Sequence, residues 1–237
     1  MKKYKVNNLE LEFNDENLVA VYQEKYRLYD RFLPHMAQYL SGTVIDVGAN
    51  CGALAVAMGA NNPELKFVCI EPEDKHLLHL RNNIQLINNP AHVERAKIGK
   101  EFLHLNALID QHQINDIGLL KVDVDGFDWD VIDTYSFNQK PPIYIEEDFK
   151  EPWQYEKYYA MNKRLSNLGY NNIWMFDNYG CLIGFTKDWD VVNSLNAYVN
   201  RMKAGQSAIT FWYMDLLLCQ DQDADKLGQG VISYISA

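Results

Sequence analysis

The sequence has few of the features that mark membrane, secreted or metal-binding proteins. Its 237 residues include only four cysteines, none in a CxxC pair, and its six histidines show no HxxxH or HExxH spacing. No apolar run approaches the ~20 residues of a membrane span, and no apolar signal-peptide segment follows the basic start of the chain. We therefore expect a cytoplasmic protein with reduced thiols and no membrane span.

Basic residues are also in the minority. Lys and Arg number 22 against 32 Asp and Glu, which leaves a formal net charge of −10. Because binding to nucleic acid or to an anionic membrane surface depends on clustered Lys and Arg, this balance argues against both partners. Hydrophobic residues make up 48% of the chain, which is typical of a globular protein with a buried core.

Strand and helix patterns alternate along the middle of the chain. Continuous apolar runs there are typical of parallel strands covered on both faces. The sequence around NYG at 178–180 instead predicts a β-hairpin over 172–186. The alternation predicts an α/β fold with a doubly wound, mostly parallel sheet that ends in an antiparallel hairpin. The predicted parallel strands are 43–48, 66–71, 117–124 and 141–147.

The two ends of the chain lie outside this alternation. Residues 4–13 alternate weakly and predict a short hairpin or an edge strand, and helical spacing with a break near Pro34 follows. After a predicted helix near 189–203, the apolar segment 211–219 fits a strand or a helix and could cover a sheet edge or a dimer contact, so a homodimer is left open. The expected parts are an N-terminal extension, a core and a C-terminal extension packed on it: 1–40, 41–188 and 189–237.

The first candidate site is the glycine-rich turn IDVGANCG, residues 45–52, between a strand and a helix. Such a turn lets a ligand approach the backbone and aims N–H groups at it. The dinucleotide fingerprint GxGxxG is met poorly, because only its first glycine, Gly48, is in place. Asp46 would repel a pyrophosphate but attract the ammonium and sulfonium of S-adenosylmethionine. Glu71 ends the next strand, at the spacing expected for an acid that binds ribose hydroxyls.

The second candidate site is LLKVDVDGFDWDVI, residues 119–132. The carboxyl ends of strands in a doubly wound sheet face the ligand crevice. Alternation would put Asp123 and Asp125 on the same side if the strand persists that far, where they could bind a divalent cation, act as a general base or hold the cofactor. Asp128 and Asp130 fit the first turn of the next helix, where acids are favoured by the helix dipole, so we interpret them as structural.

These segments together resemble the FkbM family of S-adenosylmethionine-dependent methyltransferases. VIDVGANCG (44–52) is similar to that family's VIDVGANxG turn, and FVCIEPEDKHLLHLRNNIQL (67–86) to its second strand and the Asn-rich helix after it. LLKVDVDGFDWDVI is similar to its LLKIDVEGxExxVL segment, and PPIYIEE (141–147) to its P-x-I-x-x-E strand. The resemblance extends over residues 25–150.

The resemblance implies a class I, Rossmann-like methyltransferase that transfers a methyl group from S-adenosylmethionine to a hydroxyl of a sugar, glycan or related metabolite. By position, the turn would hold the methionine end of the cofactor and Glu71 its ribose, and Asp123 would lie beside the sulfonium. The residues expected to bind the cofactor are Asp46, Gly48, Ala49, Asn50, Gly52, Glu71 and Asp123.

The chemistry of the transfer adds a base to this list. An alcohol is a poor nucleophile, and a general base typically contributes about 10²–10⁴-fold in rate. The candidates are Asp123, Asp125 and Glu146, all at predicted strand ends. Mg²⁺ is left open but not expected, and the sequence names no ligand set for it. The alternatives are a methyltransferase for a protein or amine, an NAD-linked oxidoreductase and a non-catalytic module that binds a nucleoside.

Overall fold

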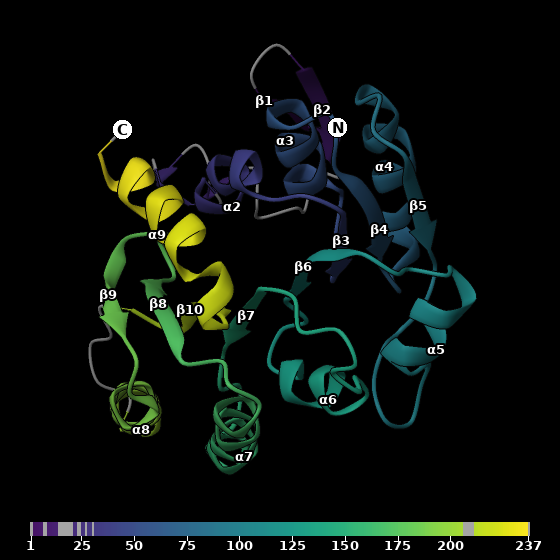
Figure 1. Cartoon of the computed structure of the whole chain (residues 1–237). Helices are drawn as coiled ribbons and strands as arrows, with labels where there is room; N and C mark the ends of the chain where they lie inside the picture. Colours follow the sequence, from purple (N-terminus) through teal and green to yellow (C-terminus); the bar gives the residue numbers. More distant parts are fainter. Residues whose placement is uncertain are drawn as a thin grey trace. The chain divides into compact units, whose positions relative to one another are not determined.

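The structure, a computed structural model, falls into two compact units that are described separately here. The first unit consists of Met1–Lys97, Gln113–Lys121 and Lys226–Ala237, and the second of Ile98–His112 and Val122–Asp225. Figure 1 colours the chain by sequence and labels its elements. The residues that the structure describes are 2–6, 9–13, 21–22, 25–26, 28–29, 31–205 and 211–236.

The first unit is built on parallel strands. β3 (Thr43–Val47) pairs in parallel with β4 (Lys66–Ile70), which pairs in parallel with β5 (Ala91–Glu94), and β6 (Ile117–Val122) lies beside β3. Every residue of β3 is buried. The unbroken apolar runs therefore have the burial expected of parallel strands covered on both faces, as the sequence predicts.

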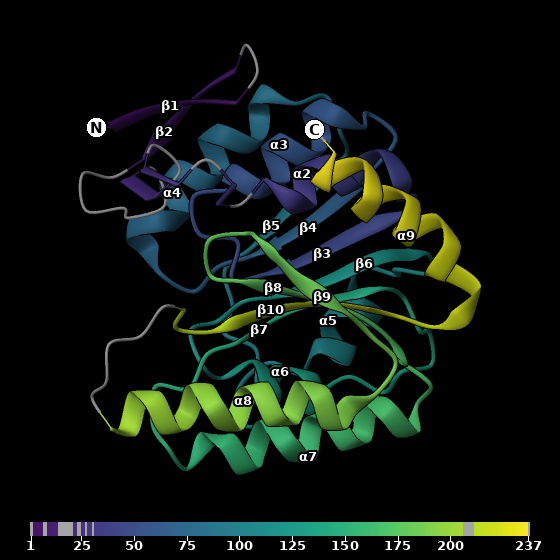
Figure 2. The same ribbon diagram turned by 90° about the vertical axis from the view of Figure 1, so that its left-hand side faces the viewer.

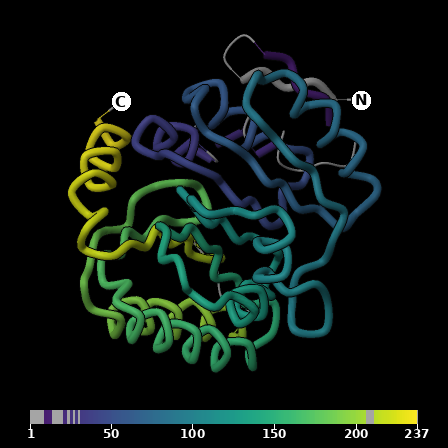
Figure 3. The backbone as a smooth tube through the Cα atoms, turned by 45° about the vertical axis from the view of Figure 1, so that its right-hand side comes forward, coloured from purple at the N-terminus to yellow at the C-terminus, as the bar shows by residue number. Residues whose placement is uncertain are grey.

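Helices connect these strands in the strand–helix–strand order of an α/β fold, a path that can be followed in blue in Figure 3. The short α2 packs on α3, and the last part of α9 belongs to this unit, where the ring of Tyr234 lies 5.3 Å from that of Phe32. The predicted helical stretch before residue 31 lies mostly outside the described residues. The helices are α2 (Phe32–Met36), α3 (Ala53–Asn61), α4 (Asp74–Asn83) and α9 (Asp221–Ile235), with 3-10 turns at Ala37–Tyr39 and Ile84–Leu86.

A β-hairpin precedes this sheet and confirms the prediction for residues 4–13. β1 (Lys2–Val6) and β2 (Leu9–Phe13) pair antiparallel, and Leu11 and Phe13 are fully buried. The side chain of Asn83 on α4 accepts from the Glu12 N–H and donates to the Glu12 carbonyl, both at 2.8 Å. It also donates to the Cys51 carbonyl at 2.8 Å, so one buried amide ties the hairpin to the glycine-rich turn.

The second unit holds an antiparallel set of strands in the order β7-β10-β8-β9. The helices α7 and α8 lie side by side in this unit (Figure 2). Its strands are β7 (Ile143–Glu147), β8 (Asn172–Asp177), β9 (Leu182–Thr186) and β10 (Met214–Cys219), and its helices are α5 (Leu105–Gln111), α6 (Asp128–Asp133), α7 (Gln154–Asn167) and α8 (Trp189–Ala204).

The chain therefore has the predicted α/β fold with a mostly parallel, mixed sheet and an antiparallel hairpin, β8–β9. One expectation is wrong: segment 211–219 does not cover a sheet edge. Its strand β10 lies between β7 and β8, and Leu216, Leu217 and Leu218 are at most 1% exposed, because an interior strand needs apolar residues on both faces. The domain limits at 40 and 188 stay predictions. None of the described helices combines the length and hydrophobicity that crossing a membrane requires.

We expect Asn83→Ala to lower the free energy of unfolding by about 2–4 kcal/mol, because it leaves backbone groups of the half-buried Glu12 and the buried Cys51 without their partner. Urea unfolding followed by circular dichroism measures the change. The matched control is Asn82→Ala at the exposed neighbouring position, which should differ from wild type by less than about 0.5 kcal/mol. Equal effects of the two substitutions would contradict this role of Asn83.

Candidate functional site

The glycine-rich turn joins β3 to α3 with two residues that need glycine. Gly48 has φ +83° and Gly52, the N-cap of α3, has φ +79°, in the left-handed region that side chains disfavour. A Cβ on Gly52 would also lie 2.7 Å from Cδ1 of Leu80 on α4. The spacing of these glycines thus follows from the local backbone path and from close packing between α3 and α4.

The backbone N–H groups of this turn are fully used within the first unit. Gly48 and Ala49 both donate to the Ile70 carbonyl at 3.0 Å. The other three bonds are Asn50 N–H to Glu71 Oε2, Cys51 N–H to Asn50 Oδ1 and Gly52 N–H to the Ala49 carbonyl, at 2.8–2.9 Å. The expectation that the turn aims its N–H groups at a ligand is therefore wrong. A phosphate would find the donors that it needs already engaged.

Glu71 follows β4 and connects the turn to the next loop. One carboxylate oxygen accepts the Asn50 N–H at 2.9 Å and the other accepts the Glu73 N–H at 2.8 Å. Burial raises the pKa of Glu71, while these two N–H groups and the charge of Lys121 lower it. A carboxylate has about four lone-pair sites, so two bonds leave Glu71 able to accept further hydrogen bonds, for example from ribose hydroxyls.

Asp46 points at a cation that sequence reasoning missed. Nζ of Lys121 on β6 lies 3.0 Å from Asp46 Oδ1 and donates to the Gly48 carbonyl at 2.9 Å. Asp46 and Lys121 are 1% and 4% exposed, so the pair is removed from water. Oδ2 of Asp46 is buried and, among the described residues, has no hydrogen-bond partner. Only the position of Lys121 inside an apolar strand could have signalled this pair in the sequence.

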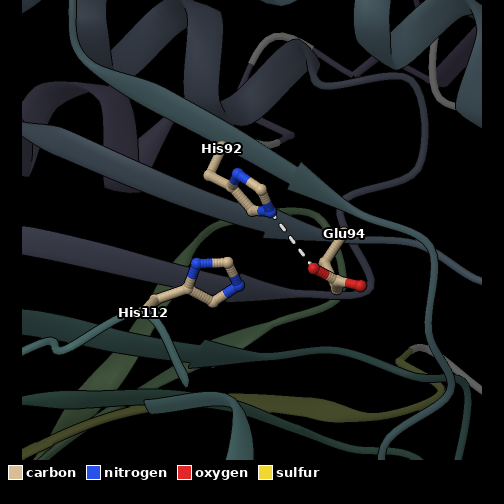
Figure 4. A group of neighbouring side chains, drawn as sticks. All are labelled: His92, Glu94 and His112. Atoms are coloured by element: carbon tan, nitrogen blue, oxygen red, sulfur yellow. Dashed lines mark hydrogen bonds and ion pairs between the residues drawn. The ribbon is translucent and has the colours of Figure 1, made fainter. Parts of the chain in front are cut away.

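The first unit also holds histidines near its loops. His76 Nδ1 lies 3.7 Å from the buried Cys51 sulfur. Nε2 of His92 lies 3.1 Å from Oε2 of Glu94, two residues along β5 and on the same face (Figure 4). His112, also drawn there, belongs to the other unit. Since zinc takes four ligands, the partly exposed pair on β5 does not by itself form a metal centre.

In the second unit, the segment after β6 is a turn and not a continuation of the strand. β6 ends at Val122, so strand alternation no longer relates Asp123 to Asp125. Asp125 has φ +56°, its side chain is 90% exposed, and its Oδ1 lies 3.4 Å from Lys150 Nζ. The structure therefore separates the environments of the two acids: Asp125 faces water, and Asp123 is half-buried.

Asp128 holds this turn together from the first turn of α6. Its Oδ1 accepts from the Val124 N–H at 3.0 Å, and its Oδ2 accepts from the Gly126 N–H at 3.2 Å and the Tyr158 hydroxyl at 2.8 Å. Burial, and then the charge of Asp123, raise the pKa of Asp128 to about 7. Its predicted position in the first helical turn is confirmed, and its bonds show how it shapes the DVDG turn.

Glu146, near the end of β7, is a buried carboxyl among other acids. Burial raises its pKa well above the usual range, and the charges of Asp123, Asp215, Asp128 and Asp148 raise it further. Asp148 itself is compensated, since both Lys150 and Lys203 contact its carboxylate. In the described part of this unit, no three of these carboxylates bring oxygen atoms within 4.8 Å of one another. The arrangement therefore favours the protonated form of Glu146 more than an exposed site would.

The sequence matches the model of a known protein family. The model of the Methyltransferase FkbM domain matches residues 32–171, more than half of the sequence. The chain belongs to the FkbM family of S-adenosylmethionine-dependent methyltransferases. The match covers the glycine-rich turn, Glu71, the DVDG turn and Glu146, so membership sets aside the oxidoreductase and the non-catalytic alternatives.

Solved structures resemble this FkbM methyltransferase at low identity. A protein of Pyrococcus horikoshii described as a transferase matches with a TM-score of 0.55 and 11% identity, over 92% of this chain and 72% of its own. A methyltransferase from Pyrococcus furiosus matches with a TM-score of 0.48, 12% identity and 91% of each chain. The plantazolicin methyltransferase BpumL, solved with SAH, matches with a TM-score of 0.47 and 11% identity, over 84% of this chain and 88% of its own. At such identities the likeness concerns the fold alone.

The search of curated protein sequences gives no match.

Glu147, next to Glu146 on β7, belongs to a separate buried network of the FkbM enzyme. Glu147 is fully buried, and Asn196 on α8 donates to its Oε2. Burial raises the pKa of Glu147 to about 7, although the side chains of Asn196 and Asn162 lower it. Among the described residues, Glu147 Oε1 and the Oδ1 atoms of Asn162 and Asn196 have no hydrogen-bond partner. A protonated Glu147 supplies the O–H that one of these amide oxygens can accept.

We expect wild type to lose stability as the pH rises from 4 to 8, and Glu147→Gln to lack the part of this loss that Glu147 causes. The folded pKa of Glu147, about 7, lies above its ordinary 4.5, so its contribution is full below pH 4.5 and is lost as the pH rises through 7. The difference corresponds to about 3 kcal/mol. Urea unfolding at both pH values measures it, and Glu156→Gln on the exposed side of α7 is the control. Parallel pH curves for wild type and Glu147→Gln would contradict this account.

Proposed function

We propose that this enzyme transfers the methyl group of S-adenosylmethionine to a hydroxyl of a sugar, glycan or related metabolite in the cytoplasm. The observation that carries the proposal is the glycine-rich turn, whose N–H groups are all engaged while the carboxylate of Glu71 beside it can accept further hydrogen bonds. A cofactor with phosphates needs N–H donors, whereas a cationic cofactor with ribose hydroxyls needs carboxylate acceptors. The first unit offers the second kind of site.

The residues proposed to bind the cofactor in this unit are those of the turn and Glu71. Glu71 accepts the ribose hydroxyls, for which it has unused lone pairs. Asp46 lies beside the turn, where its carboxylate is paired with Lys121. When bound, S-adenosylmethionine supplies a methyl group on a positively charged sulfur. The turn residues assigned to it are Gly48, Ala49, Asn50 and Gly52.

We propose that an acidic side chain of residues 123–146 takes the proton of the acceptor hydroxyl. A hydroxyl must lose its proton as the new C–O bond forms, and a carboxylate that is shielded from water is a suitable base. Burial and the neighbouring acids raise the pKa of Glu146 well above its usual range, so the base is assigned to Asp123, one of the acids whose charge acts on Glu146. In its protonated form, Glu146 can donate a hydrogen bond. Asp125 is the weaker candidate, because its carboxylate is exposed and close to Lys150.

Binding of S-adenosylhomocysteine tests the proposed cofactor directly. We would titrate the purified 237-residue protein calorimetrically with S-adenosylhomocysteine and, separately, with NADH, each with and without Mg²⁺. Micromolar binding of S-adenosylhomocysteine alone is the expected result, and its failure to bind would overturn the proposal. Saccharides, peptides and amines incubated with S-adenosylmethionine then test the acceptor class. Product formation only with peptides or amines would overturn the hydroxyl acceptor while keeping the cofactor.

We expect Glu71→Gln to weaken S-adenosylhomocysteine binding about 10- to 100-fold, because hydrogen bonds to a charged acceptor contribute about 1.5–3 kcal/mol. Calorimetry measures the dissociation constant, and the melting temperature shows whether the protein is folded. Glu64→Gln, at an exposed position of the same unit, should bind like wild type. If both variants keep wild-type affinity, Glu71 does not bind the ribose.

We expect Asp123→Asn to lower kcat about 10²–10⁴-fold while S-adenosylhomocysteine affinity stays within about threefold of wild type, because the amide cannot take a proton. Release of S-adenosylhomocysteine with a saccharide acceptor measures kcat. Asp110→Asn, at an exposed position on α5, is the matched control and should turn over normally. A fully active Asp123→Asn enzyme would exclude Asp123 as the base.

A further inference from the structure

We propose that Lys121 is a positioning residue for the cofactor: its ammonium, neutralised by Asp46, holds the Gly48 carbonyl and thereby fixes the turn that binds S-adenosylmethionine. The inference rests on the proposed cofactor site and adds a residue to it. It also reassigns Asp46, which the sequence suggests as a direct partner of the cofactor's ammonium, to a role through Lys121.

Nζ of Lys121 contacts two parts of the first unit at once: Asp46 Oδ1 on β3 at 3.0 Å and the Gly48 carbonyl at 2.9 Å. Gly48 is the residue at which the chain turns into the left-handed region, with φ +83°. On the other side of the same peptide region, Gly48 and Ala49 donate to the Ile70 carbonyl at 3.0 Å. The start of the turn is therefore held from β6 and from β4.

Lys121 and Asp46 are almost fully buried, and an isolated charge in such a site is very costly. Removing one partner of a buried pair leaves an uncompensated charge, which disturbs the surroundings more than removing both. The affinity of this site should therefore depend on the two residues jointly.

A cofactor ammonium beside Asp46 would compete with the lysine ammonium already 3.0 Å from that carboxylate. If Asp46 bound the cofactor directly, loss of Lys121 would strengthen binding. If Lys121 positions the turn, its loss weakens binding. The sign of the effect thus separates the two roles.

Among the described residues, the charge of Asp46 also acts on Cys69 and Glu71. Cys69 is its cross-strand neighbour on β4, and burial, then the charge of Asp46, raise the pKa of the thiol well above its usual range while Lys121 lowers it. The charge of Asp46 also raises the pKa of Glu71, and that of Lys121 lowers it. Because these groups are present in every variant below, differences among the variants report on the Asp46–Lys121 pair.

The test compares S-adenosylhomocysteine affinity, by calorimetry at pH 6–8, in wild type, K121M, D46N/K121M and the control K66M, whose lysine is exposed on β4. We expect K121M to bind at least tenfold more weakly than wild type. The affinity of D46N/K121M should lie between those of wild type and K121M, because no charge is left unpaired but the Gly48 carbonyl still lacks the hydrogen bond from Lys121. K66M should match wild type.

The comparison of the two variants is a readout that loss of packing alone would not move. Both lack the lysine side chain, but only K121M leaves the Asp46 charge unpaired, so a higher affinity of D46N/K121M than of K121M reports the charge pair. If K121M fails to fold, the double variant carries the test, and it should be folded and bind more weakly than wild type.

Four results would overturn the positioning role of Lys121, the requirement for the ion pair or the proposed function. K121M that binds as well as wild type, or more tightly, overturns the positioning role, as does D46N/K121M with wild-type affinity. Equal losses in K121M and D46N/K121M overturn the requirement for the ion pair. Failure of wild-type protein to bind S-adenosylhomocysteine contradicts the proposed function itself, which keeps the two conclusions distinguishable.

Discussion

The buried ion pair between Asp46 and Lys121 is the constraint on which the glycine-rich turn depends. Two charges removed from water are tolerated only when they face each other with good geometry and further hydrogen bonds. That requirement fixes β6 beside the start of the turn and sets the path of the backbone at Gly48. The engaged N–H groups and the bridging carboxylate of Glu71 complete a turn that differs chemically from a phosphate-binding loop.

Much of this architecture can be predicted because the relevant signals are local. The apolar runs of β3, β4 and β6 predict their strands, and NYG predicts the β8–β9 hairpin. By contrast, β5 is half-exposed and reads AHVE, without an apolar pattern to detect. α9 contains Gly228 and Gly230, which disfavour helix in isolation. Gly230 is needed there because a Cβ would lie 2.5 Å from the Met36 sulfur.

The candidate site shows the same division between local and distant information. The motif residues Asp46, Gly48 and Glu71 stand at predictable places because their spacing follows strand and turn lengths. The partner of Asp46 lies on a strand far along the sequence, and no local pattern states which side chain will face it. The exposure of Asp125 was likewise unpredictable, since it depends on whether the strand ends at Val122 or runs on.

The position of β10 has a consequence for how the chain acquires its structure. β7 and β8 are both hydrogen-bonded to β10, a strand that begins 67 residues after β7 ends at Glu147. Pairings between such distant segments are slow to form, because the loop between them must close before the contacts are gained. During synthesis, the edges of β7 and β8 that pair with β10 stay unpaired until residues 214–219 have left the ribosome. This unit is therefore the part of a nascent chain that should draw most heavily on chaperones.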